Sequence, residues 1–457
     1  MKSLTVEQIA EIVGGQLLCG DSGTIVTNIQ YDSRAVTDGT LFVPIKGAKV
    51  DAHQFIEDCL KNGSATLTEN DAPENAEKPY IKVNNTLAAL QKLAAYYRKQ
   101  FDIKLIGVTG SVGKTSTKEM IAAALSKGFD VMKTQGNKNS QIGMPMTMFE
   151  IQDKNEAAVI EMGMSEFGEM ERLCDVAQPN IAVMTNIGTA HIENLKTQQN
   201  IMSEKLKITD HFDKNGILFL NGDDDLLKTL HGKQPFRTVT FGIDQNCDYY
   251  ANDMQTEGFS TRFVCHHNGI AEEYTVPALG IHNVKNALAA IAIGEYLGLS
   301  KDVIQSGILT YKNAPMRQQI HQLDDFVIID DSYNASPEAT VVSLDVLKSV
   351  SGSDGKSIAV LADMLELGEE SEKLHYNVGK HLGEIHIDTL ITVGALSRST
   401  AKGAAENGCT DVQSFDTNEE AYECLKAKIG KNSTVLVKGS RGMHTDEIVS
   451  KFVKKED

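Results

Sequence analysis

The feature that most constrains the fold is an alternation of buried-strand patterns with helical patterns that begins at Lys104. KLIGVTG is followed by the helical KTSTKEMIAAALSKG, and AAVIEMG by GEMERLCDVA, before the next strand pattern, IAVMTNIG. After Met316 the alternation resumes, with strand patterns in DFVIIDDSYN, SIAVLADM, IDTLITVGA and STVLVKGSRG. Strands that alternate with helices predict βαβ units and parallel sheets. The sequence therefore predicts a central α/β domain and a smaller, Rossmann-like α/β domain after it.

The first 100 residues have a different pattern. Short β-like runs (TLFVPIKG, ATLTEN, YIKVNN) are mixed with an amphipathic stretch, LAALQKLAAYYRKQF, which predicts a helix ending near Phe101. A chain of 457 residues is long enough for about three domains. We expect domains at 1–100, 101–314 and 315–457.

Composition excludes several classes of protein. Hydrophobic residues make up 41% and charged residues 23%, as in folded soluble proteins. The net charge of −18 argues against a nucleic-acid binder, because phosphate contacts need a basic surface. The seven cysteines are scattered and suggest neither a disulfide framework nor a zinc site. With no long apolar run and no signal-peptide pattern, we expect a cytoplasmic protein that does not insert stably into membranes. We also expect the protein to be a monomer.

The stretch GVTGSVGKTSTKEM, residues 107–120, joins a predicted strand to a predicted helix. Gly110 and Gly113 would let backbone N–H groups approach an anion, Lys114 would add a full charge, and the Thr115 hydroxyl can bind Mg²⁺. A plain glycine-rich turn is the alternative. We predict that the segment binds ATP phosphates through Gly110, Ser111, Val112, Gly113, Lys114, Thr115 and Ser116.

Two side chains suited to metal binding follow predicted strands. Glu161 ends the apolar run AAVI, and His191 comes shortly after IAVMTNIG. Both positions belong to the carboxyl edge of a parallel sheet, where such sheets bind ligands. A surface carboxylate and a structural histidine are the alternatives.

Val108 stands where the general phosphate-loop pattern has its first glycine. With that difference, TGSVGKTS resembles the shortened loop of the Mur ligases and folylpolyglutamate synthetases, which couple ATP to amide-bond formation. The resemblance to the Mur ligase family covers nearly the whole chain. It rests on DSRAVTDGTLFVPIKG, QGNKNSQIGMP, EMGMSEFGEM, TNIGTAHIE, GIHNVKNALAA, DDSYNASP, LADMLELG and VKGSRGM.

The resemblance implies roles for the central residues. Lys114, Glu161, His191 and Lys205 would be catalytic, with two Mg²⁺ ions held by Thr115, Glu161, His191 and Lys205. Lys205 would be carbamylated by CO₂, which turns an ammonium into an anion. Lys207 is the alternative position for that modification.

For the ends of the substrates, the resemblance implies further residues. Asn283, Asn286, Arg317 and Asp331 would complete the ATP site, although helix capping is an alternative for the two asparagines. UDP-sugar-peptide and dipeptide contacts are implied for Ser33, Arg34, Lys46, Gly47, Asn137, Asn139, Asn334 and Asp363. Two departures from the family pattern are Ala52, where glycine is usual, and Ser140, where asparagine is usual.

Within the family, EMGMSEFGEM is most similar to ligases that add D-alanyl-D-alanine to UDP-N-acetylmuramoyl-tripeptide. We therefore expect an ATP-dependent ligase that forms an acyl phosphate from the tripeptide. The ligase that adds the third amino acid is a rival, but the third domain lacks an Asp-Asn-Pro-Arg segment. A nucleotide-dependent switch on a ligase fold is the alternative from another class.

Overall fold

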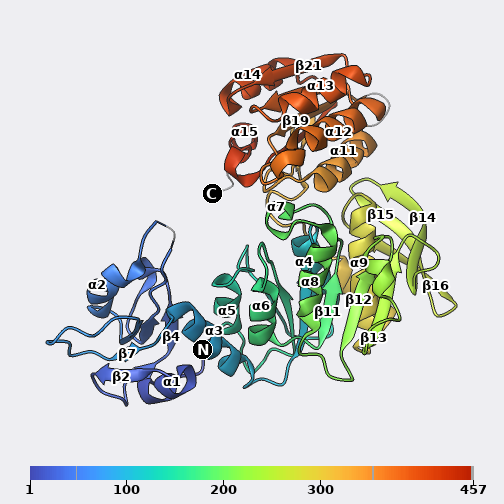
Figure 1. Ribbon diagram of the computed structural model, residues 1–457. Helices are drawn as coiled ribbons and strands as arrows, with labels where there is room; N and C mark the ends of the chain where they lie inside the picture. The colour runs from blue at the N-terminus through green and yellow to red at the C-terminus, as the bar shows by residue number, and fades with distance from the viewer. Residues whose placement is uncertain (48, 352–354, 454–457) are drawn as a thin grey trace.

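The computed structural model describes residues 1–47, 49–351 and 355–453. The chain forms α/β domains that follow one another along the sequence, and each is built on its own main sheet (Figure 1). The predicted fold class is confirmed. The predicted domain limits fall in the connections between α3 and β8 and between α10 and β17, and we propose them as the boundaries.

The N-terminal domain combines a five-stranded sheet with a small two-stranded one. The main sheet has the order β2-β7-β6-β5-β4, and only β2 pairs antiparallel within it. The strands are β1 (Leu4–Thr5), β2 (Gln16–Cys19), β3 (Ile25–Val26), β4 (Asn28–Gln30), β5 (Thr40–Phe42), β6 (Ala65–Thr68) and β7 (Tyr80–Lys82). The helices are α1 (Val6–Val13), α2 (Ile56–Leu60) and α3 (Thr86–Arg98). Helix α3 is the amphipathic helix predicted to end near Phe101.

The central domain is built on a nine-stranded sheet of order β16-β15-β14-β13-β12-β11-β8-β10-β9. Its strands are β8 (Lys104–Thr109), β9 (Val131–Lys133), β10 (Ala157–Glu161), β11 (Ile181–Met184), β12 (Ile217–Asn221), β13 (Arg237–Gly242), β14 (Tyr249–Glu257), β15 (Ser260–His267) and β16 (Ile270–Val276). The pairing is parallel from β9 to β14, which confirms the predicted βαβ pattern. The antiparallel hairpins of β14 to β16 extend the sheet beyond what we predicted.

Helices cover both faces of this sheet. They are α4 (Lys114–Leu125), α5 (Gly143–Met148), α6 (Glu169–Ala177), α7 (Ile192–Leu195), α8 (Gln198–Leu206), α9 (Ile281–Tyr296) and α10 (Lys301–Ile308). The predicted apolar positions of α4, Met120, Ile121, Ala124 and Leu125, are all buried, and α4 packs against α9. This packing fixes the direction in which the start of α4, with its glycine-rich loop, points.

The C-terminal domain has a six-stranded sheet of order β17-β18-β22-β19-β20-β21, parallel except for β17. The strands are β17 (Gln319–Gln322), β18 (Phe326–Asp330), β19 (Ser357–Ala362), β20 (Thr389–Val393), β21 (Asp411–Phe415) and β22 (Ser433–Lys438). The helices are α11 (Pro337–Ser351), α12 (Ser371–Glu384), α13 (Arg398–Glu406), α14 (Asn418–Lys428) and α15 (Asp446–Ser450). All four strand patterns predicted for this region are strands.

The N-terminal and central domains share one hydrophobic core. Helix α3 packs against α5 and α6, and the Tyr97 hydroxyl donates a hydrogen bond to the backbone oxygen of Ile151 at 3.1 Å. The C-terminal domain has its own core clusters and lies above the central domain in Figure 1. In the part of the chain that the structure describes, no helix is both long and apolar enough to cross a bilayer.

Candidate active site

Parallel pairing brings the ends of three central strands to one edge of the sheet. Strand β8 lies between β10 and β11, and Thr109, Glu161 and Met184 are their last residues. The glycine-rich loop begins directly after β8, and the segment carrying Asn186 and His191 follows β11. The sheet edge therefore gathers the residues that the sequence singled out.

The loop is held in place by the end of β11. Thr185 Oγ1 donates to the Val112 carbonyl at 2.6 Å, and Asn186 Oδ1 accepts from the Val112 N–H at 2.8 Å. Gly110 and Gly113 have φ angles of +151° and +85°. A Cβ on Gly110 would lie 1.9 Å from Thr185 Oγ1, so that position requires glycine. The loop is thus a preformed turn at the N-terminus of α4, which suits an anion.

Lys114 lies in the first turn of α4 and curls over the loop. Its Nζ donates to the carbonyl oxygens of Gly110 at 2.8 Å and Ser111 at 3.3 Å. Burial lowers the pKa of Lys114, while the negative charge of Glu161 opposes that shift. The ammonium group is therefore already at the loop, where a phosphate would replace backbone oxygens as its partner.

Glu161 is the centre of a buried polar cluster. Its side chain is 2% exposed, and its two oxygens accept from Thr115 Oγ1 at 2.9 Å and Asn139 Nδ2 at 2.7 Å. Lys118 Nζ lies 3.8 Å from the same carboxylate. A carboxylate beside a hydroxyl and an amide is a set of oxygen donors that suits Mg²⁺. The residues present therefore fit the implied metal.

Lys205 and Lys207 have different surroundings, although both are near the end of α8. Lys205 is 1% exposed and donates from Nζ to the Gly110 carbonyl at 3.0 Å. Burial lowers the pKa of Lys205 well below its ordinary value, and the charge of Lys114 adds to that effect. Lys207 instead lies partly exposed between Glu204 and Glu171. The fold brings Lys205, not Lys207, to the loop.

His191 has a left-handed backbone conformation, with φ +62°, in the segment after β11. Its Nδ1 lies 3.3 Å from a carboxylate oxygen of Glu366 in the C-terminal domain. Burial, followed by the charge of Lys114, lowers the pKa of His191. His191 is thus at the boundary between the two domains, on the cavity wall.

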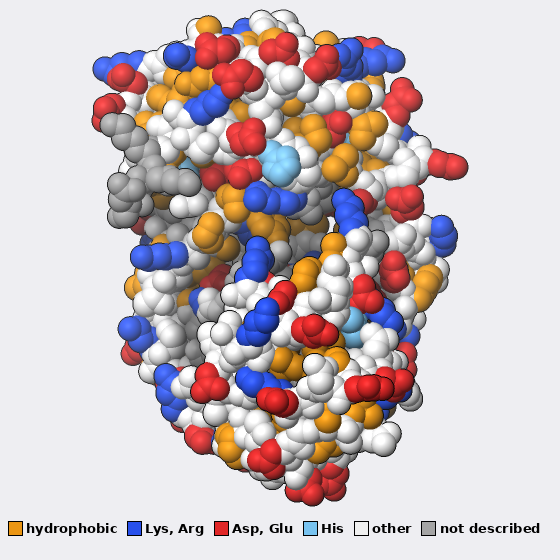
Figure 2. Space-filling view, turned by 90° about the vertical axis from the view of Figure 1, so that its left-hand side faces the viewer, with side chains coloured by type: hydrophobic (Ala, Val, Ile, Leu, Met, Phe, Trp, Pro, Cys, Tyr) orange, Lys and Arg blue, Asp and Glu red, His pale blue; other side chains and the backbone are white. Residues whose placement is uncertain are grey.

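A cavity of about 510 Å³, the loop cavity, opens between the central and C-terminal domains. Figure 2 shows a hollow beneath the C-terminal domain, with Lys and Arg side chains around it. The predicted residues that line the loop cavity are Ser111, Val112, Gly113, Lys114, Thr115, Ser116, Asn139, Glu161, His191, Asn283, Asn286, Arg317, Asp331 and Asn334. Most of the predicted ATP site is therefore in one place.

Asn283 and Asn286 form part of the cavity wall at the start of α9. Asn286 Oδ1 accepts from Thr117 Oγ1 at 2.7 Å, and Asn283 Nδ2 donates to the Leu279 carbonyl at 2.8 Å. Both side chains are buried. The Asn286 bond ties α9 to α4, and the Asn283 bond holds the segment just before α9, so the asparagines position the cavity wall as well as facing it.

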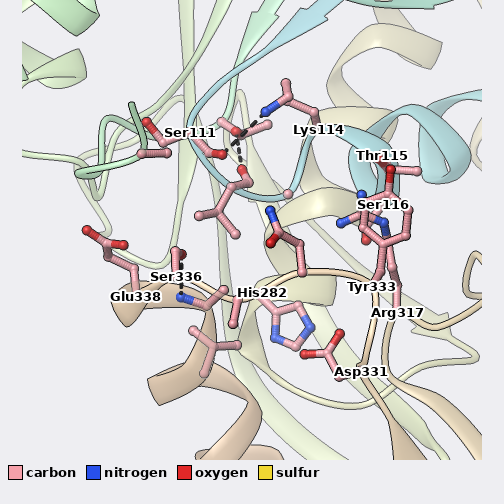
Figure 3. Close-up of a pocket in the computed structure, with 18 of the residues that line it drawn as sticks. Ser111, Lys114, Thr115, Ser116, His282, Arg317, Asp331, Tyr333, Ser336 and Glu338 are labelled. Atoms are coloured by element: carbon pink, nitrogen blue, oxygen red, sulfur yellow. Dashed lines mark hydrogen bonds between the residues drawn. The ribbon is translucent and has the colours of Figure 1, made fainter. Parts of the chain in front are cut away.

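The C-terminal domain contributes a cation to the opposite wall. The Arg317 guanidinium lies over the Tyr333 ring, with Cζ 4.1 Å from the centroid, and the pair lies beside Ser116 in Figure 3. Asp331 accepts from Lys438 Nζ at 2.5 Å and from Ser343 Oγ at 2.6 Å. Asp331 is therefore already paired, and its partner Lys438 is a second cation in the cavity wall.

Several predicted residues lie elsewhere. Asp363 and Asn137 are not among the described residues that line the loop cavity. The Asp363 carboxylate accepts from the Ser397 N–H at 2.7 Å, and Asn137 is exposed. Asn334, by contrast, faces the cavity, and its Oδ1 accepts from the Arg441 N–H at 3.3 Å.

Ser33, Arg34, Lys46 and Gly47 belong to the N-terminal domain. Arg34 pairs with Asp32 at 2.7 Å, and Lys46 pairs with Glu69 at 2.6 Å. A second cavity, of about 840 Å³, lies beside the Ser33 segment and is lined by Asp32 and Ala35 together with residues of the central domain. The Ser33–Arg34 segment thus lies next to this second cavity, whereas Lys46 and Gly47 are not among the described residues that line it.

Sequence reasoning missed several residues of the loop cavity. Glu338 Oε1 accepts from the N–H and the hydroxyl of Thr189, both at 3.0 Å, across the domain boundary. His282 Nε2 lies 2.8 Å from Gln318 Oε1, and burial lowers the pKa of His282 to about 4. No local pattern predicts these contacts, because each joins segments that are distant in sequence. The only sequence feature that could have pointed to Glu338 is the motif DDSYNASP, which directly precedes it.

The fold and the loop cavity define a three-domain α/β enzyme of the nucleotide-binding class. Family profiles described as "Mur ligase family, catalytic domain", "Mur ligase middle domain" and "Mur ligase, glutamate ligase domain" match residues 25–98, 108–294 and 316–441. The UDP-N-acetylmuramoyl-tripeptide–D-alanyl-D-alanine ligase of Bacillus subtilis is 36% identical over 98% of each chain. The enzyme of the same name from Escherichia coli is 32% identical over 98% of each chain. The chain belongs to the Mur ligase family.

Solved structures agree with this assignment. A crystal structure of MurF from Acinetobacter baumannii has a TM-score of 0.91 and 30% identity, with 100% of both chains covered. The MurF ligase of Thermotoga maritima, solved in complex with ADP, has a TM-score of 0.84 and 28% identity. The comparison covers 93% of this chain and 97% of that one.

Proposed function

We propose that this chain uses ATP to join D-alanyl-D-alanine to UDP-N-acetylmuramoyl-tripeptide, in the synthesis of a peptidoglycan precursor. The observation that carries the proposal is that Lys114, Glu161 and Arg317, from two domains, line one cavity beside a phosphate-type loop. The two relatives named above are called by this activity, and their similarity to this chain extends over nearly their full lengths. The ADP bound to the Thermotoga maritima relative supports ATP as the nucleotide.

The reaction proceeds in two steps. A carboxylate oxygen of the tripeptide attacks the γ-phosphorus of ATP, the bond to ADP breaks, and an acyl phosphate forms. The amine of D-alanyl-D-alanine then attacks the acyl carbon, and the tetrahedral adduct loses a proton and phosphate to leave the amide. Lys114 and Arg317 offset the charge on the transferring phosphoryl group, and closure of the two domains would limit access of water to the cavity.

Thr115, Glu161, His191 and Lys205 are the residues that would hold two Mg²⁺ ions. Bound Mg²⁺ supplies positive charge that offsets the phosphate oxygens. Thr115 and Asn139 hold the Glu161 carboxylate in position at the sheet edge. Each of the four proposed residues belongs to the central domain, so the metal ligands would stay together when the domains move.

We propose that Lys205 reacts with CO₂ through its neutral amine, so that an N–C bond forms and a proton is released. Burial lowers the pKa of Lys205 well below its ordinary value, which favours the neutral amine that this reaction needs. The carbamate would carry a negative charge at a position where Lys114 is the neighbouring cation.

For the other substrates, we propose that Ser33, Arg34, Lys46 and Gly47 contact the UDP-sugar-peptide beside the second cavity. Asn139 and the exposed Asn137 would contact the peptide end of this substrate. Asn334 and Asp363 would belong to the region that receives the dipeptide, and Asp363 would also hold the start of α13 through its bond to the Ser397 N–H.

The protein would work as a monomer in the cytoplasm, where ATP is available. One chain supplies both walls of the loop cavity, so a second copy is not needed to complete it.

The test is a coupled assay of ADP release. The expected result is turnover that requires both UDP-N-acetylmuramoyl-tripeptide and D-alanyl-D-alanine, with the amide product detected by mass spectrometry. A nucleotide switch would instead hydrolyse or exchange nucleotide without forming that product. ADP release that is indifferent to the dipeptide would refute the proposed function.

A further inference from the structure

A second cluster of metal-ligating side chains lies in the central domain, outside the loop cavity. It consists of His267 at the end of β15, Glu272 on β16 and Glu295 in the last turn of α9. These elements form the antiparallel extension of the sheet and the helix that packs on it, at the right of Figure 1. Of the described residues that line the loop cavity, none belongs to this cluster.

Strand pairing explains why the three side chains meet. Glu272 pairs with Cys265, which is two residues from His267 on β15. Since side chains alternate between the faces of a strand, Glu272 and His267 share one face. Helix α9 packs on β15 and β16, and Glu295 reaches the same point from it.

The distances match those around a single ion. His267 Nε2 lies 3.1 Å from a Glu295 oxygen and 3.7 Å from a Glu272 oxygen. One ligand atom from each residue lies within 4.8 Å of the others. Zinc bonds of about 2.0–2.1 Å in a tetrahedral arrangement place neighbouring ligand atoms about 3.3 Å apart. The two separations from His267 Nε2, 3.1 Å and 3.7 Å, are close to that value.

The imidazole is buried and lacks a hydrogen-bond partner. The His267 side chain is 5% exposed, and neither ring nitrogen makes a hydrogen bond to any residue that the structure describes. The Glu295 oxygen is near Nε2 but out of line with an N–H bond. The competing explanation is an ion pair between His267 and the carboxylates. In such a pair the N–H of the imidazole would point at a carboxylate oxygen and form a hydrogen bond, which Nε2 does not do here. Ligand atoms that converge on one point favour an ion.

Neighbouring groups orient the two carboxylates, as groups around metal sites do. The Tyr249 hydroxyl donates to Glu295 at 2.8 Å, and its ring stacks on His267 at 5.0 Å between centroids. The Tyr274 hydroxyl donates to Glu272 at 3.2 Å.

We propose that His267, Glu272 and Glu295 bind one Zn²⁺ ion. One imidazole nitrogen and two carboxylates suit Zn²⁺, whereas Mg²⁺ and Ca²⁺ take six or more oxygen ligands. The ion would join β15, β16 and α9. Because α9 also carries Asn283 and Asn286, the site braces one wall of the loop cavity without taking part in the reaction.

Zinc content and thermal stability test the proposal. The full-length protein is equilibrated with Zn²⁺ in excess Mg²⁺, dialysed, and analysed for bound zinc. The wild-type protein is expected to hold one equivalent more than His267→Gln, and added Zn²⁺ should raise its Tm but not that of the variant. Equal zinc content in the two proteins would overturn the proposal.

The neighbouring histidine offers a matched control. His266 is on the opposite face of β15, where its Nε2 lies 2.9 Å from Asn252 Oδ1. His266→Gln should keep the extra equivalent, and its loss there would overturn the assignment. Glu272 is a more exposed ligand, and Glu272→Gln should also lose the ion. This variant replaces His267→Gln in the test if the histidine variant does not fold. Retention of the full equivalent by a folded Glu272→Gln would refute the site.

Discussion

Replacing Gly110 with alanine tests how the loop is held. Gly110 has φ +151°, and a Cβ there would lie 1.9 Å from Thr185 Oγ1 and 3.2 Å from the backbone nitrogen of Asn186. The Thr185 hydroxyl cannot move away without breaking its 2.6 Å hydrogen bond to Val112. The substitution should therefore strain the loop and detach it from the end of β11.

The expected cost follows from these contacts. The backbone strain costs about 1–3 kcal/mol, and the steric overlap about 1–3 kcal/mol more. Together these terms predict that Gly110→Ala destabilises the central domain by about 2–6 kcal/mol. Gly113→Ala is the matched control, because its Cβ would meet only Thr117 Oγ1 at 4.0 Å. Its φ of +85° predicts a cost of only about 1–2 kcal/mol.

The assay is urea unfolding followed by far-ultraviolet circular dichroism, since the sequence has no tryptophan. The decisive comparison places Gly110→Ala in a Thr185→Ala background, where the clashing hydroxyl is absent. The substitution should then cost clearly less than in the wild-type background. An equal cost in both backgrounds, or equal costs for the Gly110 and Gly113 variants, would refute the steric argument.

Lys114→Ala should lower kcat/KM on the order of 10³-fold or more, because a charge at the transferring phosphoryl group is lost; near-normal ligation by the folded variant would contradict this. Lys205→Ala should be nearly inactive and partly rescued by short-chain carboxylates, and Lys207→Ala should remain active; rescue confined to the Lys207 variant would move the modification there. Arg317→Lys should lower kcat/KM on the order of tenfold, because lysine keeps the charge but loses the planar fork and the stack on Tyr333; unchanged kinetics would exclude a phosphate role. ATP should favour closure of the C-terminal domain on the central domain, seen by small-angle scattering as a smaller radius of gyration with a nonhydrolysable analogue and the UDP-sugar-peptide; equal radii with binding shown independently would mean a preassembled site.

Local patterns were sufficient for the parallel strands that flank the loop and for the loop itself, but not for the antiparallel strands β14 to β16. Buried strands such as β8 and β10 are runs of apolar residues, and the helices that follow carry apolar residues at helical spacing. A parallel sheet then requires that all strand ends meet at one edge, which is why Glu161 and the loop could be expected together. The two glycines of the loop, Gly110 and Gly113, were readable from the sequence as a turn before α4, because glycine adopts positive φ angles at low cost.

Only the tertiary structure distinguished residues with similar local sequence. Lys205 and Lys207 are two positions apart, yet Lys205 is buried against Gly110, whereas Lys207 is partly exposed and pairs with Glu171 and Glu204. His266 and His267 are adjacent, yet they face opposite sides of β15. The burial and the charge partners of a side chain depend on segments that are far apart in the sequence. The residues next to it in the sequence therefore do not predict its surroundings. The same reason applies to the contact of Glu338 with Thr189, which joins two domains.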